Sequence, residues 1–312
     1  MLRIGLLATL SAIFLAACQP TPPMQTDSVS DVAESVRFMS APAGYWSNQS
    51  PRRYSFGKTS EPVRYGATAE RFEVRWGDCG GTDCGAPRYR SEIGVSRGRT
   101  RARFDQDIWY GWSFRNGNIP DFSGSTNPFI TVGQWKMGGS NNPIIKIQQL
   151  GRGDNNFSGC NSSICSRSVS APSGDVFLQL GDMMNVVPAN AQNNWMQVCR
   201  LFDMRSAKTQ WQDIVLNTNF STSDNGYLNV WVNGRQVCAY RGRIVATKDT
   251  SMYPGPNHRR GIYVSGHRRW DNARPGQPLP TFIAYYDEFR VGKSRAEVDV
   301  RMIEARGAAA VD

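Results

Sequence analysis

The sequence predicts an all-β sandwich of the jelly-roll type as its main domain. From about residue 45 onward, apolar and polar residues alternate in short runs, which is the period of a strand and not of a helix. Turn residues separate these runs, and many short strands with turns between them are typical of a sandwich. The dipeptide Asn233-Gly234 directly follows one run and is a strong hairpin signal, because both turn positions need a positive φ.

The expected strands follow one another along the chain, and a helical segment comes after them. The strands cover residues 108–114, 128–135, 144–150, 176–180, 227–232, 260–264 and 282–291. These runs are rich in β-branched and aromatic residues, which favour strands. Residues 293–308 have the composition of a helix instead.

The N-terminus has the features of an export signal. Residues 1–17 carry one early cation, an apolar run and small residues, which is typical of a secretory signal peptide. Residues 15–18 (LAAC) resemble the lipobox of bacterial lipoproteins, which implies cleavage before Cys18 and lipidation of that cysteine. Gln19 follows in place of Asp, which implies sorting to the outer membrane. The alternative is an ordinary secretory signal.

Composition divides the chain into four parts. A lipoprotein signal peptide (1–17) precedes the lipidated cysteine and a flexible tether rich in Pro, Ser and Thr (18–44). The sandwich domain follows (45–292), and a helical or disordered tail ends the chain (293–312). We expect an exported monomer that faces the periplasm or the cell surface and contacts the membrane through its lipid anchor only.

The cysteines indicate disulfides. Six remain after Cys18, and an even number in an exported chain is typical of paired thiols. Two pairs share the spacing C-x4-C, and two further cysteines end strand-like runs. We expect Cys79–Cys84, Cys160–Cys165 and Cys199–Cys238, although six cysteines allow other pairings. We expect no metal site, because neither C-x4-C pair has a histidine nearby.

The charge of the chain points to an acidic partner. Lys and Arg number 36 against 26 Asp and Glu, for a net charge of +10. Such a balance suits a nucleic acid, an anionic lipid or a polyanionic glycan. Export argues against nucleic acid, so we expect an anionic polysaccharide. The two histidines, His258 and His267, are too few for a multi-histidine metal site, and we expect His258 to lie exposed in a loop.

One arginine-rich stretch has the pattern of a strand. Arginines occupy alternate positions at 97, 99, 101 and 103, and Arg88 and Arg90 alternate in the same way upstream. If the stretch is extended, Arg99 and Arg101 project from one face with their neighbours and form a cationic rail for a polyanion. The alternative is a solvated outer face of a strand.

Four motifs occur in an order that resembles a known family. They are residues 88–92 (RYRSE), 132–136 (VGQWK), 260–263 (RGIY) and 285–292 (YYDEFRVG). The set resembles the jelly-roll polysaccharide lyases, which include heparin lyase I-like, glucuronan lyase-like and alginate lyase-like enzymes with R-x-E, Q-x-H and G-x-Y strands on one concave face. The resemblance covers about residues 50–292 and implies a concanavalin-like jelly roll that cleaves a uronate-containing polysaccharide by β-elimination.

The resemblance implies a role for each motif residue. Removal of the proton beside a uronate carboxylate requires neutralisation of that carboxylate, which we assign to Arg90 and Gln134. Tyr263 becomes the acid and base, and Glu92 fixes Arg90. We expect cations near Tyr263 in the sequence to lower its pKa, namely Arg259, Arg260, Arg268 and Arg269.

The chain departs from the family at one position, where Lys136 stands in place of the histidine. Lys136 can neutralise a carboxylate but is a poor base unless it is desolvated, so His267 is a second candidate base. We expect no cofactor, with a structural calcium ion near Asp287 as an alternative. The expected substrate-binding residues are Arg88, Glu92, Arg99, Arg101, Trp135, Arg260 and Arg268.

Two other functions agree less well with the sequence than a lyase does. A glycosidase of similar fold would need closely spaced acids on one strand, and the sequence has no E-x-D-x-x-E motif. A non-catalytic carbohydrate-binding lipoprotein of the same fold is the stronger alternative. Aromatic side chains could serve such a binding face, and the candidates are Trp109, Trp112, Trp135 and Trp270.

Overall fold

The computed structural model of the chain describes most of the residues that follow position 35. The described ranges are residues 36–47, 52–85, 88–96, 98–122, 126–138, 142–149, 175–186, 197–251 and 253–312. Residues 1–17, the tether up to position 35, Cys18 and the Cys160–Cys165 pair lie outside them. In the described part of the chain, no helix is both long and apolar enough to cross a membrane.

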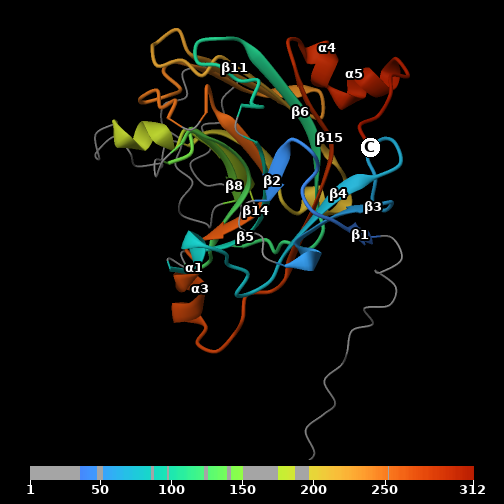
Figure 1. Cartoon of the computed structure of the whole chain (residues 1–312), viewed down its shortest axis with the longest axis vertical. Coiled ribbons are helices and arrows are strands. Elements are labelled where there is room, and N and C mark those ends of the chain that lie inside the picture. Colours follow the sequence, from blue (N-terminus) through green and yellow to red (C-terminus); the bar gives the residue numbers. More distant parts are fainter. Residues whose placement is uncertain are drawn as a thin grey trace, which may run out of the picture. The chain divides into compact units, whose positions relative to one another are not determined.

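Two antiparallel sheets form the two layers of the fold (Figure 1). The eight strands of the first sheet are, in spatial order, β1 (Val36–Phe38), β3 (Phe56–Thr59), β4 (Ala69–Val74), β15 (Phe282–Gly292), β6 (Ile108–Asn116), β11 (Gln212–Thr218), β12 (Tyr227–Val232) and β13 (Arg235–Arg241). The seven strands of the second sheet are β10 (Gln197–Asp203), β9 (Asp175–Gln179), β8 (Ile145–Gln149), β7 (Phe129–Lys136), β14 (Asn257–Ser265), β5 (Tyr89–Val95) and β2 (Tyr45–Ser47).

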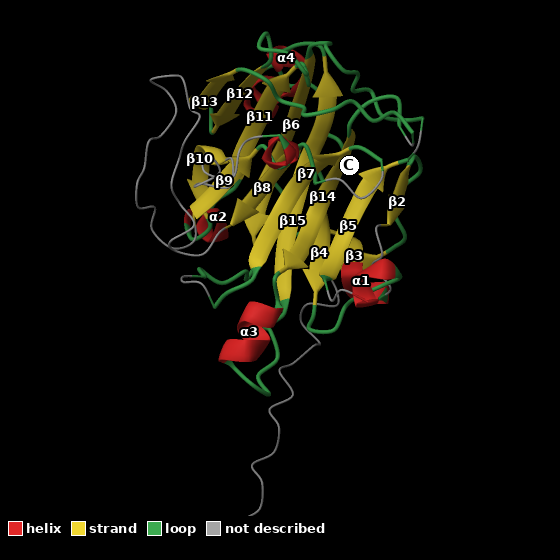
Figure 2. Cartoon of the chain, turned by 90° about the vertical axis from the view of Figure 1, so that its left-hand side faces the viewer, coloured by secondary structure: helices red, strands yellow, loops and turns green. Residues whose placement is uncertain are grey.

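Helices are short and lie outside the sheets. Figure 2 shows α3 beyond one end of the strands. The helices are η1 (Arg53–Ser55), α1 (Thr82–Gly85), η2 (Asp182–Asn185), α2 (Ser206–Thr209), α3 (Arg268–Ala273), α4 (Arg295–Val298) and α5 (Val300–Ala305). The last two lie within the residues expected to be helical or disordered.

The observed fold confirms the all-β jelly-roll prediction. All seven expected runs coincide with strands, and their ends agree to within three residues. Asn233 and Gly234 connect β12 to β13 with φ angles of 52° and 82°, as the hairpin signal requires. The strands β4 and β11 were not among the expected runs, because charged residues such as Arg71 and Asp213 interrupt their apolar pattern.

The core fills the space between the sheets. Large aromatic side chains of both layers meet there, including Phe72, Phe114 and Tyr286 from the first sheet and Trp135 from the second. The Tyr286 hydroxyl lies within hydrogen-bond distance of the carbonyl oxygens of Val132 (2.5 Å) and Gly261 (2.9 Å), so it links the two sheets.

Two of the three expected disulfides are present in the described residues. Cys79–Cys84 closes the loop between β4 and β5. Cys199–Cys238 joins β10 of the second sheet to β13 of the first, so it connects an edge strand of each layer. The first pair is local in sequence, whereas the second holds the two sheets together.

The expected cationic rail is wrong. Residues 98–104 form a turn and a loop instead of a strand, and position 97 lies outside the described residues. Gly98 has a φ of 78°, which starts the turn, and Thr100 Oγ1 donates to the carbonyl oxygen of Pro256 (2.6 Å). Arg101 donates to the carbonyl oxygen of Val291, on the first sheet. These arginines therefore do not share a strand face.

Candidate active site

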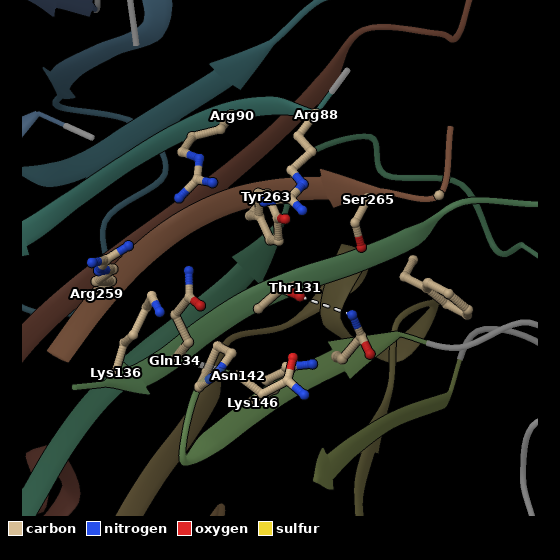
Figure 3. A pocket seen from close by; sticks show the side chains of 14 residues that line it. Arg88, Arg90, Thr131, Gln134, Lys136, Asn142, Lys146, Arg259, Tyr263 and Ser265 are labelled. Atoms are coloured by element: carbon tan, nitrogen blue, oxygen red, sulfur yellow. Dashed lines mark hydrogen bonds between the residues drawn. The ribbon is translucent and has the colours of Figure 1, made fainter. Parts of the chain in front are cut away.

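A cavity of about 410 Å³ lies on the outer face of the second sheet (Figure 3). Strands β5, β14, β7 and β8 supply most of its walls. Among the described residues, its lining includes five Lys or Arg residues and no Asp or Glu. The lining residues are Arg88, Arg90, Phe129, Thr131, Gln134, Lys136, Asn142, Pro143, Lys146, Gln148, Arg259, Tyr263, Ser265 and Gly266.

Strand alternation explains which side chains reach the cavity. Successive side chains of a strand point to opposite faces, so Arg259, Tyr263 and Ser265 on β14 line the cavity. Their neighbours Ile262 and Val264 enter the core and are fully buried. The outward residues of adjacent strands meet in rows, because neighbouring strands pair residue by residue.

Two such rows build the site. In the first, Tyr263 is paired with Arg90 on β5 and with Thr131 on β7. In the second, Gln134 on β7 is paired with Arg259 on β14 and with Lys146 on β8. Side chains that are directly opposite on one face lie close enough to interact. The register therefore brings together residues from the consecutive strands β7 and β8 and from β5 and β14, which are far from them in the sequence.

Arg90 is held in place by two carboxylates. Its Nη1 donates to Glu92 Oε2 (3.0 Å) and its Nη2 to Asp83 Oδ1 (3.0 Å), while its Nε lies 2.7 Å from Asp83 Oδ2. The guanidinium also lies 4.2 Å from the centroid of the Tyr263 ring. Glu92 accepts a further hydrogen bond from Gln134 Nε2 (2.6 Å). One buried carboxylate thus orients both Arg90 and Gln134.

Asp83 is a site residue that the sequence reasoning missed. It lies in α1, inside the loop that the Cys79–Cys84 disulfide closes, and its side chain is buried. The backbone in and directly before this loop also pairs with the chain around the start of β5, since Arg88 N donates to Asp83 O and Arg90 N to Asp78 O (3.1 Å each). The sequence signal was an acidic residue within a cysteine loop directly before the R-x-E strand.

Burial controls the protonation of Tyr263. The pKa of Tyr263 is raised above its usual value because burial of the phenolate outweighs the opposing effect of Arg90 and Arg88. The expected lowering of this pKa by nearby cations is therefore wrong. Arg260 points into the opposite layer, and Arg268 lies exposed on α3, so neither lines the cavity with Tyr263.

The two lysines of the cavity titrate in an unusual range. Burial lowers the pKa of Lys136 to about 8, and the charges of Arg259 and Arg90 add to this effect. Burial alone lowers the pKa of Lys146 to about 8. Lys146 was not expected in the site, because its short run carries no motif and its place depends on pairing with Gln134.

Two expected substrate-binding residues face the wrong side of their strands. Trp135 is fully buried in the core between Gln134 and Lys136, which face the cavity. Arg260 is 4% exposed and donates from Nε and Nη2 to the two oxygens of Glu70 (2.5 Å each). Strict alternation from Tyr263 would have identified Arg259 as the outward arginine in place of Arg260.

Four further candidates lie away from the cavity lining. Arg99 and Arg101 belong to the loop after β5, and Arg268 is exposed on α3. His267 is buried beside the Tyr89 ring, and its Nε2 lies 3.6 Å from Asp271 Oδ2.

His258 is buried, so the expectation that it is exposed is wrong. It occupies an inward position of β14 and stacks on the Phe289 ring, with 4.4 Å between centroids.

The described residues offer little for a metal or for an aromatic sugar platform. They contain no group of three or more His, Cys, Asp and Glu side chains that could hold a metal ion. The Asp287 carboxylate already accepts hydrogen bonds from three backbone amides, and burial raises its pKa to about 6. None of the four candidate tryptophans is among the residues that line the cavity.

Comparison with known proteins identifies the family of this chain. A family model described as polysaccharide lyase matches residues 40–307. The chain belongs to this polysaccharide lyase family. A search of curated proteins finds none that matches this polysaccharide lyase.

Among solved structures, the endo-β-1,4-glucuronan lyase of the fungus Trichoderma reesei is similar, with 17% identity and a TM-score of 0.55 over 84% of this chain and 96% of that one. A family 7 alginate lyase, A1-II′, has 13% identity and a TM-score of 0.44 over 75% and 80% of the two chains. A GH131 β-glucanase catalytic domain from Podospora anserina has 10% identity and a TM-score of 0.49 over 85% and 88%. The likeness to the glucuronan lyase supports the jelly-roll fold of this polysaccharide lyase.

Proposed function

We propose that this polysaccharide lyase cleaves an acidic, uronate-containing polysaccharide by β-elimination. The observation that carries the proposal is a cavity whose described lining holds five cations, several amides and hydroxyls, and no carboxylate. Such a lining attracts an anionic polymer. The part of the lining that the structure describes does not supply the pair of carboxylates with which glycosidases work, and its residues suit elimination.

The chemistry of elimination assigns roles to the residues. A base removes the proton at C5 of the uronate, the C4–O4 bond breaks, a C4–C5 double bond forms, and O4 receives a proton from an acid. Hydrogen bonds and positive charge at the carboxylate stabilise the negative charge that develops at C5. We assign this task to Arg90 and Gln134, and the hydrogen bonds by which Glu92 orients both side chains support the assignment.

The opposite pKa shifts of two cavity residues separate the acid from the base. The raised pKa of Tyr263 keeps its hydroxyl protonated, which suits the donor of the proton to O4. The lowered pKa of Lys136 gives a neutral amine near pH 8, which suits the base that removes the C5 proton. Tyr263, expected from the sequence to act as both acid and base, thus keeps the role of acid, and Lys136 takes the role of base.

We also propose that the enzyme is exported as an outer-membrane lipoprotein anchored through Cys18. The apolar N-terminal segment and the LAAC motif support this, as do the disulfides, which need an oxidising compartment. Labelling of the expressed protein with a radioactive fatty acid, which Cys18→Ser should abolish, would test it.

The lyase proposal is tested by incubating the purified domain with a panel of uronate polymers. Elimination creates a conjugated C4–C5 double bond, so we expect ultraviolet absorbance to rise with at least one polymer. Hydrolysis would release reducing ends without that absorbance. Binding without any product would support the carbohydrate-binding alternative and contradict the lyase.

Substitution of Lys136 tests its role as base. For the wild type we expect kcat/KM to rise as the pH increases through about 8, because only the neutral amine accepts a proton. Lys136→Arg should lose about 10²- to 10⁴-fold in kcat and lack this rise, since guanidinium stays protonated. Lys146→Gln, which removes the other lysine of similar pKa, should keep the rise.

A role of Lys136 in charge neutralisation alone predicts a different pH dependence. If Lys136 only neutralises charge, wild-type activity falls above pH 8 and Lys136→Arg remains active, which would refute the base assignment.

A further inference from the structure

Two arginines reach the same part of the cavity, but their charges are balanced differently. Arg90 is paired with the carboxylates of Asp83 and Glu92. Arg259 has no carboxylate within 4.0 Å among the residues that the structure describes. Its side-chain hydrogen bond there runs from Nε to Asn257 Oδ1 (3.4 Å).

The surroundings of Arg259 are unfavourable for its charge. The residue is 9% exposed, and its guanidinium lies 5.1 Å from the centroid of the Trp46 ring. Burial lowers its pKa despite the opposing charge of Glu92, and Arg90 adds repulsion. A buried charge without a counter-ion costs folding free energy. An anion that enters the cavity would offset this cost.

The backbone around Arg259 makes room for this side chain. Its partner on β5 is Gly94, where an added Cβ would lie 3.3 Å from Arg259 Cγ and 3.1 Å from Trp46 Cε2. Its partner on β7 is Gln134, which Glu92 orients. Figure 3 shows the ends of Arg90, Arg259, Gln134 and Lys136 gathered at one part of the cavity.

We propose that Arg259 supplies the positive charge that binds the carboxylate of the reacting uronate, and that it thereby makes the site selective for the free acid over its methyl ester. The inference rests on the proposed lyase function. Arg90, whose charge is balanced by Asp83 and Glu92, contributes hydrogen bonds and packs on the Tyr263 ring. A guanidinium binds a carboxylate through charge-assisted hydrogen bonds, and a neutral ester cannot provide the charge.

The experiment compares Arg259→Gln and Arg259→Lys on one polymer in two forms, the free acid and the methyl ester. The polymer is the uronate on which the wild type gives the elimination signal. On the free acid, Arg259→Gln should lower kcat/KM about 10- to 150-fold, because a hydrogen bond to a charged group contributes that much. Arg259→Lys, which keeps the charge, should lose less. On the ester, Arg259→Gln and the wild type should differ little.

Controls separate this effect from a general disturbance. Arg241→Gln, on β13 of the other sheet, should keep the wild-type selectivity. Two results would overturn the proposal. The first is that Arg259→Gln loses kcat/KM equally on the acid and on the ester. The second is that Arg259→Gln has wild-type activity on the free acid. Thermal unfolding of both Arg259 variants shows whether they are folded, and a folded Arg259→Lys keeps the test valid if Arg259→Gln does not fold.

The assignment of Arg259 can fail or survive independently of the lyase proposal. If the wild type produces no unsaturated sugar from any polymer, the lyase proposal fails. Equilibrium binding of the free-acid and ester forms of polygalacturonate then tests Arg259 directly. If Arg259→Gln binds the free acid more weakly than the wild type does but binds the ester equally well, the assignment is supported. Equal binding of the free acid by the wild type and by Arg259→Gln refutes it.

Discussion

Replacement of Tyr263 by phenylalanine is expected to lower kcat by about 10²- to 10⁴-fold while KM changes little. The hydroxyl is the proposed proton donor to O4, and loss of a positioned general acid has an effect of this size. The ring remains, so its packing against the Arg90 guanidinium at 4.2 Å is kept. The rate of formation of the unsaturated product, measured over a range of substrate concentrations, gives kcat and KM separately.

A second tyrosine provides a matched control. Tyr240 on β13 is buried, and its hydroxyl donates to the carbonyl oxygen of Arg243 (3.2 Å). Tyr240→Phe removes a buried hydroxyl from the other sheet and should leave kcat unchanged. Near-normal kcat in Tyr263→Phe would refute the assignment of the acid.

Replacement of Asp83 by alanine is expected to reduce both stability and activity. Removal of one partner of a buried ion pair costs about 3–5 kcal/mol, and we expect the lower end because Glu92 still pairs with Arg90. Arg90 then loses the support at its Nε and Nη2 atoms, so KM should rise and kcat should fall. Denaturant unfolding measures the free energy, and elimination kinetics measure the activity.

The pair of Asp175 and Arg200 serves as the control for Asp83. Asp175 is fully buried on β9, and Arg200 Nη2 lies 2.6 Å from its Oδ1, away from the cavity lining. Asp175→Ala should destabilise the protein without a change in KM. If Asp83→Ala and Asp175→Ala differ only in stability and both keep wild-type kinetics, then Asp83 does not position Arg90 for the reaction.

The local patterns of the sequence predicted several of the residues that line the cavity. Arg88, Arg90, Gln134, Lys136 and Tyr263 all line one cavity, as the ordered motifs indicated. Each of them lies in or beside a strand whose alternation is a property of the local chain, so a motif suffices to find it.

The predictions of site residues were wrong where a motif did not show which face of its strand a residue occupies. Trp135 and Arg260 directly adjoin cavity residues but point into the core, and strict alternation would have excluded both. Arg99 and Arg101 alternate in sequence, yet a turn at Gly98 removes them from any strand. A period of two predicts a face only where the backbone is extended.

The sequence by itself determined the fold class, the hairpin at Asn233-Gly234, the local cysteine pair and the types of residue in the site. These features depend on neighbours within a few positions. Only the tertiary structure decided that Lys146 and Arg259 flank Gln134, that Asp83 holds Arg90, and that the pKa of Tyr263 rises while that of Lys136 falls. The physical reason is that strand register and burial set the distances between charges and their access to water, and both depend on segments far apart in the chain.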